Sequence, residues 1–119
     1  MADPPEPLSP ELVRMVLNLS TSHGEPRPET MLYVATTRGA AETLVRGLPP
    51  QVSIPVDSEP VWLIQLRGHF VARRGPMCQP PATGTVMHLI VHRATPHVRA
   101  VSIGGRAVDL RRLGTPGLA

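Results

Sequence analysis

Residues 61–71 read VWLIQLRGHFV, and this stretch decides the fold class of a chain of 119 residues. Its odd positions include Gln65, Arg67 and His69, whereas its even positions carry no polar side chain. A period of two is typical of a half-buried β-strand, so we expect the even positions to face the core and the odd positions to face outward. The even-numbered residues of this strand are Trp62, Ile64, Leu66, Gly68 and Phe70.

Two helices are predicted before this strand. Ser9 is the expected N-cap of a helix over Pro10–Ser22, because a serine hydroxyl accepts from free amides and proline suits the first helical position. Thr37 is the expected N-cap of a shorter helix over Arg38–Arg46. Gly47 follows this second helix and supplies the left-handed conformation that ends it.

Three further strands are predicted at residues 30–36, 85–92 and 98–103, where β-branched and apolar residues lie between turn residues. The last two flank a loop at residues 93–96 and form a hairpin. In this register we expect His92 opposite His97, Val91 opposite Val98 and Leu89 opposite Ala100. Residues 73–84 contain three prolines and two glycines, and are predicted to be a loop.

The order of these elements predicts an α+β fold. An N-terminal helix and a short second helix pack on a mostly antiparallel sheet of about four strands, with a helix on one face. Residues 1–8 are acidic and rich in proline, which is typical of a disordered tail, and residues 9–119 are predicted to form a single domain. Residues 108–113 close the chain as a short clip, with Leu110 and Leu113 as anchors.

Composition and charge exclude several classes of protein. All twelve basic residues are arginine, and only three residues are aromatic, which excludes the usual aromatic platform for stacking bases. Residues 1–59 carry four arginines against eight acids, whereas residues 60–119 carry eight arginines against one acid. The two halves either neutralise each other in the fold or indicate an anionic partner. No apolar run reaches membrane-spanning length and the first residues lack signal-peptide features, so a cytoplasmic protein is expected.

Four short segments, in this order along the chain, carry a resemblance to known proteins. They are YVATTRGAA at residues 33–41, VWLIQLRGHF at 61–70, PATGTVM at 81–87 and DLRRLG at 109–114. The series resembles a group of small uncharacterised actinobacterial proteins, over about residues 30–116. The last hairpin is also loosely similar to the strand-turn-strand of PepSY and cystatin-like α+β domains. The resemblance implies the fold and adds no chemistry, because that group has no established activity.

An arginine-rich sheet face is the most prominent candidate binding surface. If the outward side chains of the central strand and of the hairpin converge, they form a surface for a partner or for phosphate groups. The residues predicted to form this arginine-rich face are Gln65, Arg67, His69, Arg73, Arg74, Arg93 and Arg99.

Metal binding and catalysis find little support in the sequence. His92 and His97 are predicted cross-strand neighbours, yet no third ligand lies nearby in sequence. Cys78 is the only cysteine and has no family signature around it. The chain has no P-loop, no dinucleotide-binding glycine pattern, no serine elbow and no paired carboxylates, so we expect neither a cofactor nor an enzyme.

These observations favour a non-enzymatic binding or protein-interaction module that presents its sheet face or an edge to a protein or peptide. The alternative is a nucleic-acid-binding protein that uses the arginine-rich face. A homodimer through the sheet is also expected, because outward apolar side chains need cover. These apolar residues are Val61, Leu63, Val71, Ile90 and Val101.

Overall fold

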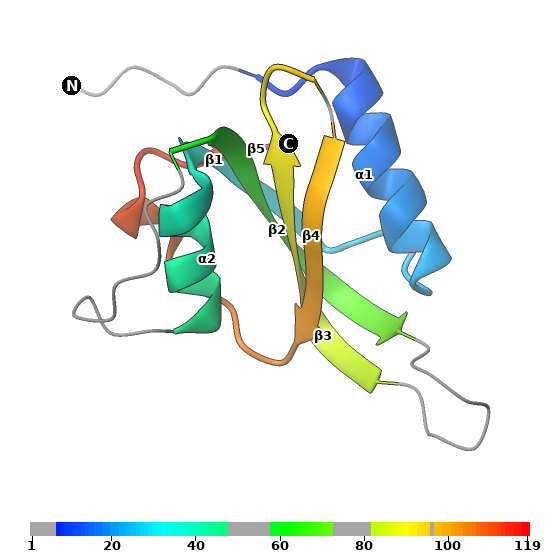
Figure 1. Ribbon diagram of the computed structural model, residues 1–119. Coiled ribbons are helices and arrows are strands. Elements are labelled where there is room, and N and C mark those ends of the chain that lie inside the picture. Colours follow the sequence, from blue (N-terminus) through cyan, green and yellow to red (C-terminus); the bar gives the residue numbers. More distant parts are fainter. Residues whose placement is uncertain (1–6, 48–57, 73–81, 96) are drawn as a thin grey trace.

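The chain folds around a five-stranded antiparallel sheet with the strand order β4-β3-β2-β1-β5 (Figure 1). The structure, a computed structural model, describes residues 7–47, 58–72, 82–95 and 97–119. Its elements are α1 (Pro10–Ser22), β1 (Thr30–Thr37), α2 (Arg38–Arg46), β2 (Pro60–Ala72), β3 (Ala82–His92), β4 (His97–Gly104), the 3-10 helix η1 (Leu110–Arg112) and β5 (Gly117–Leu118). The predicted α+β class is therefore confirmed, with β5 as an additional short strand.

Local sequence signals account for the ends of both helices. The Ser9 hydroxyl accepts a hydrogen bond from Leu12 N at 3.1 Å, and the Thr37 hydroxyl accepts one from Ala40 N at 3.3 Å. Each bond satisfies an amide that the helix itself leaves free. Gly47 ends α2 in the left-handed conformation, with φ of 68°. Both N-caps and the glycine stop are confirmed.

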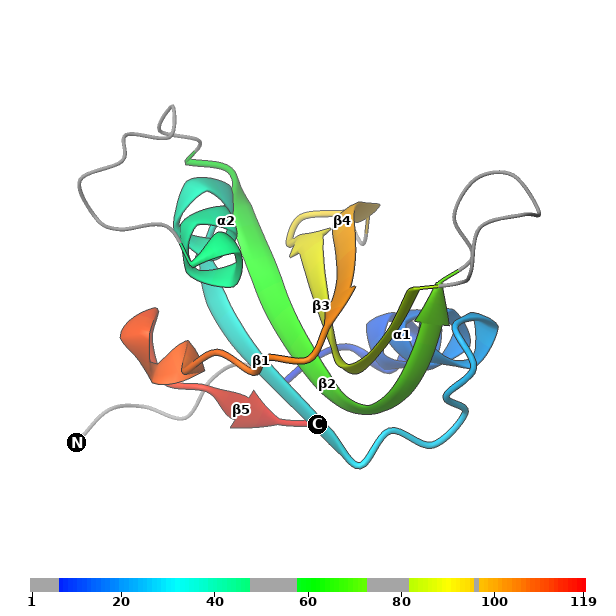
Figure 2. The same ribbon diagram turned by 90° about the horizontal axis from the view of Figure 1, so that it is seen from below.

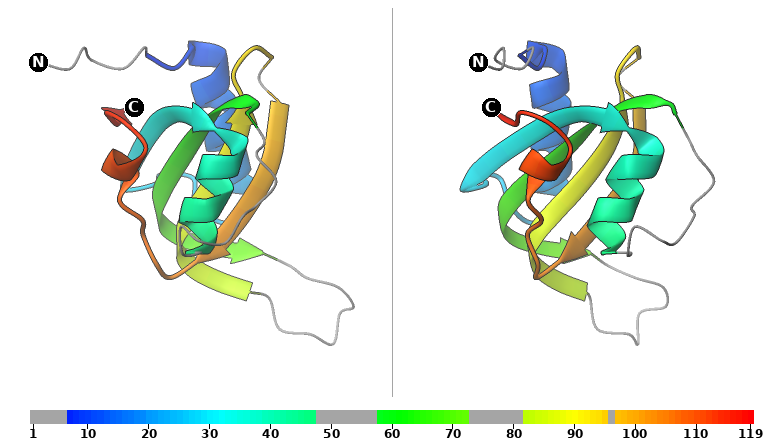
Figure 3. Two further views of the ribbon diagram at one scale, coloured as in Figure 1. Left: turned by 60° about the vertical axis from the view of Figure 1, so that its left-hand side comes forward. Right: turned by 90° about the vertical axis from the view of Figure 1, so that its left-hand side faces the viewer.

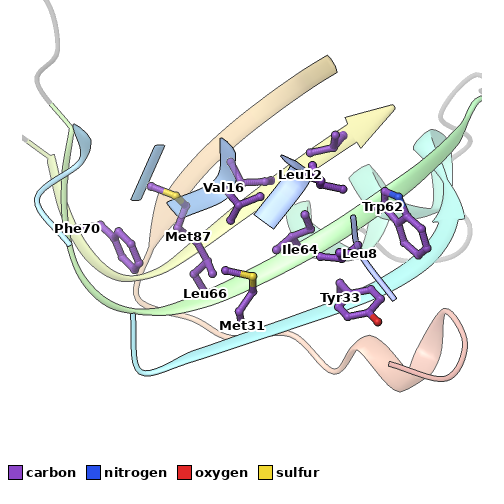
Figure 4. Packing of buried hydrophobic residues seen from close by; sticks show 12 residues of the cluster. Leu8, Leu12, Val16, Met31, Tyr33, Trp62, Ile64, Leu66, Phe70 and Met87 are labelled. Atoms are coloured by element: carbon purple, nitrogen blue, oxygen red, sulfur yellow. The ribbon is translucent and has the colours of Figure 1, made fainter. Parts of the chain in front are cut away.

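The main core lies between α1 and one face of the sheet (Figure 4). Leu12 and Val16 of α1 pack against the even-numbered side chains of β2 and against β1 and β3. Trp62 is buried there, as predicted, and its ring meets the edge of Tyr33 with centroids 5.5 Å apart. Leu8 also belongs to this core, which corrects the prediction that residues 1–8 have nothing to pack against.

The opposite face of the sheet is covered as well, by α2 and by the segment that carries η1 (Figures 1 and 2). Ala41 and Leu44 of α2 and Leu110 of η1 form a second core over it. The expectation of a helix on one face is therefore wrong for this sheet. The residues predicted to point outward but buried in this second core are Val61, Leu63 and Ile90.

The register of the β3–β4 hairpin is confirmed only up to its first pairs. His92 lies opposite His97 and Val91 opposite Val98, but the register then shifts between Ile90 and Val91. This β-bulge adds one residue to β4 at Arg99. Leu89 therefore lies opposite Val101 rather than Ala100, and Val101 turns to the α1 side of the sheet.

Strand β3 begins earlier than predicted. Residues 82–84 belong to it instead of to a loop, and they pair with residues 70–72 of β2 beyond a second bulge. The remainder of the predicted loop, which holds Cys78, lies outside the described residues. No helix among the described residues is long and apolar enough to cross a membrane.

Candidate functional site

The residues predicted to form the arginine-rich face occupy several separate places. Arg67 and His69 are exposed on β2 and line a hollow of about 330 Å³ together with Glu29 and Thr85. Arg93 lies over the ring of Trp62, 4.8 Å from its centroid. The predicted members Arg73 and Arg74 lie outside the described residues, whereas Gln65 is buried and Arg99 is exposed but paired with Glu59.

Gln65 is buried, which corrects its predicted place on an outward surface. Its side chain is only 3% exposed, because the segment before η1 crosses this face of the sheet. Gln65 Oε1 accepts hydrogen bonds from Val108 N and from His88 Nε2, both at 2.8 Å. The buried Gln65–His88 pair thus ties β2 and β3 to the C-terminal segment.

The buried environment lowers the pKa of His88. It is 6% exposed, and burial lowers the pKa of its imidazole from 6.5 to about 4. The imidazole is therefore neutral near pH 7, with Nε2 carrying the proton that it donates to Gln65. The hydrogen bond from Nε2 to Gln65 gives His88 a structural role between β2 and β3.

Arg99 belongs to a polar cluster around Glu59, which we call the Glu59 cluster and which is defined by contacts of this carboxylate to Arg99, Arg38 and His92. Arg99 Nη2 lies 2.7 Å from Glu59 Oε1, and His92 Nε2 lies 3.3 Å from the same oxygen. Arg38 Nη1 approaches Oε2 at 3.7 Å and also faces Glu42 at 3.5 Å. The Glu59 cluster joins an acid of the first half to an arginine of the second half, Arg99, as expected if the two halves neutralise each other.

The β2 bulge beside His69 is held by Glu25. The carboxylate of Glu25 accepts hydrogen bonds from His69 N and Arg27 N, both at 3.0 Å, and these bonds lower its pKa. A Cβ at Gly68 would lie 2.7 Å from Glu25 Cγ, so glycine is needed for this close approach. Both oxygens of the Glu25 carboxylate are therefore engaged by backbone amides.

The candidate metal ligands of the sequence are not brought together among the described residues. His92 and His97 are register partners, but among the described residues no group of three or more His, Cys, Asp or Glu side chains lies close enough to hold a metal ion. Asp109 is bound by Arg111 through two oxygens, at 2.9 and 3.1 Å, and this contact lowers the pKa of Asp109. The carboxylate of Asp109 is thus bound by an arginine, and that of Glu25 by backbone amides.

β4 is the longer of the two edge strands of the sheet. Among the described residues it pairs with β3 alone, so its other side presents N–H and C=O groups that no described strand pairs with. Its first half is blunted by the bulge at Arg99, but residues 100–104 read AVSIG and carry no charge, proline or further bulge. We call residues 100–104 the open edge; Val101 within it is 40% exposed.

The sequence analysis did not predict this open edge, because it depends on the position of a β-bulge. The run of uncharged residues was visible in the sequence, but the bulge that turns Val101 was not. Natural edge strands use charge, proline or bulges to prevent pairing with other chains, and the absence of these devices from residues 100–104 is the signal that could have found the edge.

No protein-family model, curated protein or solved structure matches this chain. The resemblance to the actinobacterial group and to PepSY or cystatin-like domains therefore stays a prediction. The fold itself defines the class: an α+β domain whose antiparallel sheet is covered on both faces and is open along β4.

Proposed function

We propose that this chain is a non-catalytic protein-interaction module that takes up an extended segment of another polypeptide along the open edge of β4. The observation that supports it is a five-residue stretch of edge backbone, residues 100–104, with none of the features that block strand addition. In strand addition the main-chain hydrogen bonds supply affinity, and alternate side chains supply specificity.

The exposed side chains around the open edge define the partner's chemistry. Val101 and Ile103 lie on the α1 side of β4, whereas Ala100 and Ser102 lie on the other side. A β-branched or aromatic residue on the partner strand would pair with Val101 across the new ladder. The partner is therefore an extended segment with apolar residues at alternate positions.

The described members of the arginine-rich face give the nucleic-acid alternative less support than the open edge gives a peptide partner. Among the described members of the arginine-rich face, Arg99 is bound to Glu59, Arg93 covers Trp62, and Gln65 is buried. Arg67 and His69 remain exposed, but they share their hollow with the carboxylate of Glu29. Non-specific nucleic-acid binding depends on several phosphates neutralised together, which this arrangement does not favour.

The proposal is tested by selecting binders from a displayed library of random extended peptides and repeating the binding with Val101→Lys. We expect selected peptides to protect amides of residues 100–104 from hydrogen exchange. Lysine on an edge strand opposes pairing, so Val101→Lys should weaken binding at least about tenfold, or about 1.4 kcal/mol.

The matched control is Val71→Lys, because Val71 of β2 is also 40% exposed and does not lie on the open edge. It should bind the selected peptides as the unmodified chain does. Protection located elsewhere, equal losses in both variants, or a library that yields no binders would overturn the proposal.

Self-association is a separate outcome of the same experiment. The predicted homodimer rested on five uncovered apolar residues, of which only Val71 and Val101 are exposed in the structure. Two side chains cannot form a sheet-face interface of ordinary size, about 800 Å² per partner. A dimer seen by light scattering and abolished by Val101→Lys would assign the open edge to a second copy and overturn the proposal of a different partner.

A further inference from the structure

We propose that a pocket between α2 and the C-terminal segment binds a small organic anion, with its carboxylate or phosphate group held by Arg106 and Arg112. The apolar body of the ligand would rest against Leu44 and Leu113. This anion pocket uses residues other than those of the open edge, so it is a second binding function beyond the proposed one.

The pocket has the size and lining of a small-molecule site. Its volume is about 360 Å³, which lies within the range of about 300–1,000 Å³ that is usual for ligand pockets. Figure 3 shows the segment that carries η1 running beside α2, and both contribute residues to the lining of the pocket. The residues that line it are Ala40, Thr43, Leu44, Gly47, Arg106, Arg112 and Leu113.

The positive charge of the pocket is not neutralised within the described residues. Arg106 and Arg112 are both exposed, and the guanidinium group of neither forms a hydrogen bond or an ion pair with another described residue, although the charge of Arg112 contributes to the lowered pKa of Asp109. Asp109, the acid between them in sequence, is bound by Arg111 through both of its oxygens. Glu42 of the adjacent helix faces Arg38.

The end of α2 does not remove this charge. The C-terminal end of a helix carries roughly half a negative charge, which attracts the two guanidinium groups but leaves most of their charge unbalanced. Thr43 uses its hydroxyl hydrogen on Gly39 O at 2.8 Å, so it does not donate to a ligand. Recognition of an oxyanion therefore falls to Arg106 and Arg112, and paired guanidinium groups suit carboxylate and phosphate geometry.

The apolar wall indicates an organic anion rather than an inorganic one. Leu44 is 9% exposed and Leu113 is half-buried, and both line the pocket with Ala40. A bare phosphate ion would leave this wall in contact with water, whereas an attached aromatic or short aliphatic group would cover it. The predicted ligand thus combines one oxyanion with a small apolar body.

The test is a calorimetric titration of the whole chain with phenyl phosphate, benzoate, inorganic phosphate and benzyl alcohol. We expect saturable binding of phenyl phosphate or benzoate in the millimolar range or tighter. Inorganic phosphate should bind more weakly and benzyl alcohol should not bind, because each lacks one of the two recognised parts. The stronger of the two aromatic anions identifies phosphate or carboxylate as the group recognised.

Two variants locate the site. The double change Arg106→Gln and Arg112→Gln should weaken binding at least about tenfold, or about 1.4 kcal/mol. The change Leu113→Ala should reduce the preference for phenyl phosphate over inorganic phosphate. The matched control, Arg14→Gln with Arg27→Gln, alters two other exposed arginines and should leave affinity unchanged.

Each contrary result overturns the proposal. Absence of saturable binding, equal affinity for phenyl phosphate and inorganic phosphate, or equal losses in the control pair would each exclude the anion pocket. Unfolding midpoints of all variants, measured alongside, separate loss of binding from loss of fold. Failure here leaves the open edge untouched, because no residue of β4 is changed.

Discussion

His88 is a buried residue whose lowered pKa makes the stability of the fold depend on pH. Its imidazole lies between β2 and β3, donates to Gln65 Oε1, and has a pKa lowered by burial to about 4. In the unfolded chain the same group titrates near 6.5. Between these two values the unfolded state binds more protons than the folded state, so the free energy of unfolding falls as pH falls.

We predict that lowering the pH from 7 to 5 reduces the free energy of unfolding by about 2 kcal/mol through His88, since each pKa unit corresponds to about 1.4 kcal/mol. Urea unfolding at both pH values measures this loss. The variant His88→Gln removes the titrating group and should abolish most of the difference. His97→Gln changes an exposed histidine of the hairpin and should retain it. A full pH effect in His88→Gln would contradict the assignment.

At the scale of elements, η1 acts as the clip that completes the second core. Leu110 is 3% exposed and packs beside Val34 and Leu44, on the face where the sequence predicted open surface. The predicted role of Leu110 as an anchor is therefore confirmed. Its place explains why α2, only nine residues long, suffices to cover that face together with the C-terminal segment.

We predict that Leu110→Ala lowers the free energy of unfolding by about 2–5 kcal/mol, because it leaves a cavity beneath η1. Leu118→Ala is the matched control, since Leu118 is 74% exposed and its loss should change stability by less than about 0.5 kcal/mol. Chemical denaturation of the two variants compares them directly. Similar losses in both would show that η1 does not anchor the segment.

Elements defined by neighbouring residues could be predicted from the sequence. The caps at Ser9 and Thr37 and the stop at Gly47 depend on residues within one helical turn, and each was predicted where it is found. The alternation in β2 likewise placed Trp62 in the core. Periodicity reports one buried face, however, and the second face is covered by chain that lies far away in sequence.

The candidate sites depended on such distant contacts, and this is why their prediction was incomplete. Gln65 was predicted to point outward because it lies at an odd, polar position of the strand. In the structure its side chain is buried and hydrogen-bonded to Val108 N and His88 Nε2. Arg99 looked free because Glu59 lies 40 residues away in sequence. The position of the bulge in β4, which defines the open edge, has no signal in a pattern of alternating residues.

At the scale of the whole molecule, the two oppositely charged halves meet at the Glu59 cluster. Glu59 belongs to the acidic half and binds Arg99 and His92 of the basic half. The other exposed arginines in the part of the chain that the structure describes are distributed over separate places, including the hollow at Arg67 and the proposed anion pocket at Arg106 and Arg112. A dispersed pattern of this kind favours small or single anionic groups over a polyanion.

We therefore predict that the chain shows no strong, steeply salt-dependent binding to generic double-stranded DNA or RNA. Each phosphate neutralised by a protein adds about 0.9 to the slope of log affinity against log salt, so a continuous arginine face would give a slope of several units. Fluorescence anisotropy titrations from about 50 mM salt upward measure this slope. A strong, salt-sensitive signal that falls by about two to three units in the triple change Arg67→Ala, Arg73→Ala and Arg74→Ala would contradict the prediction. That result would mean that Arg67 acts together with Arg73 and Arg74 as one phosphate-binding surface.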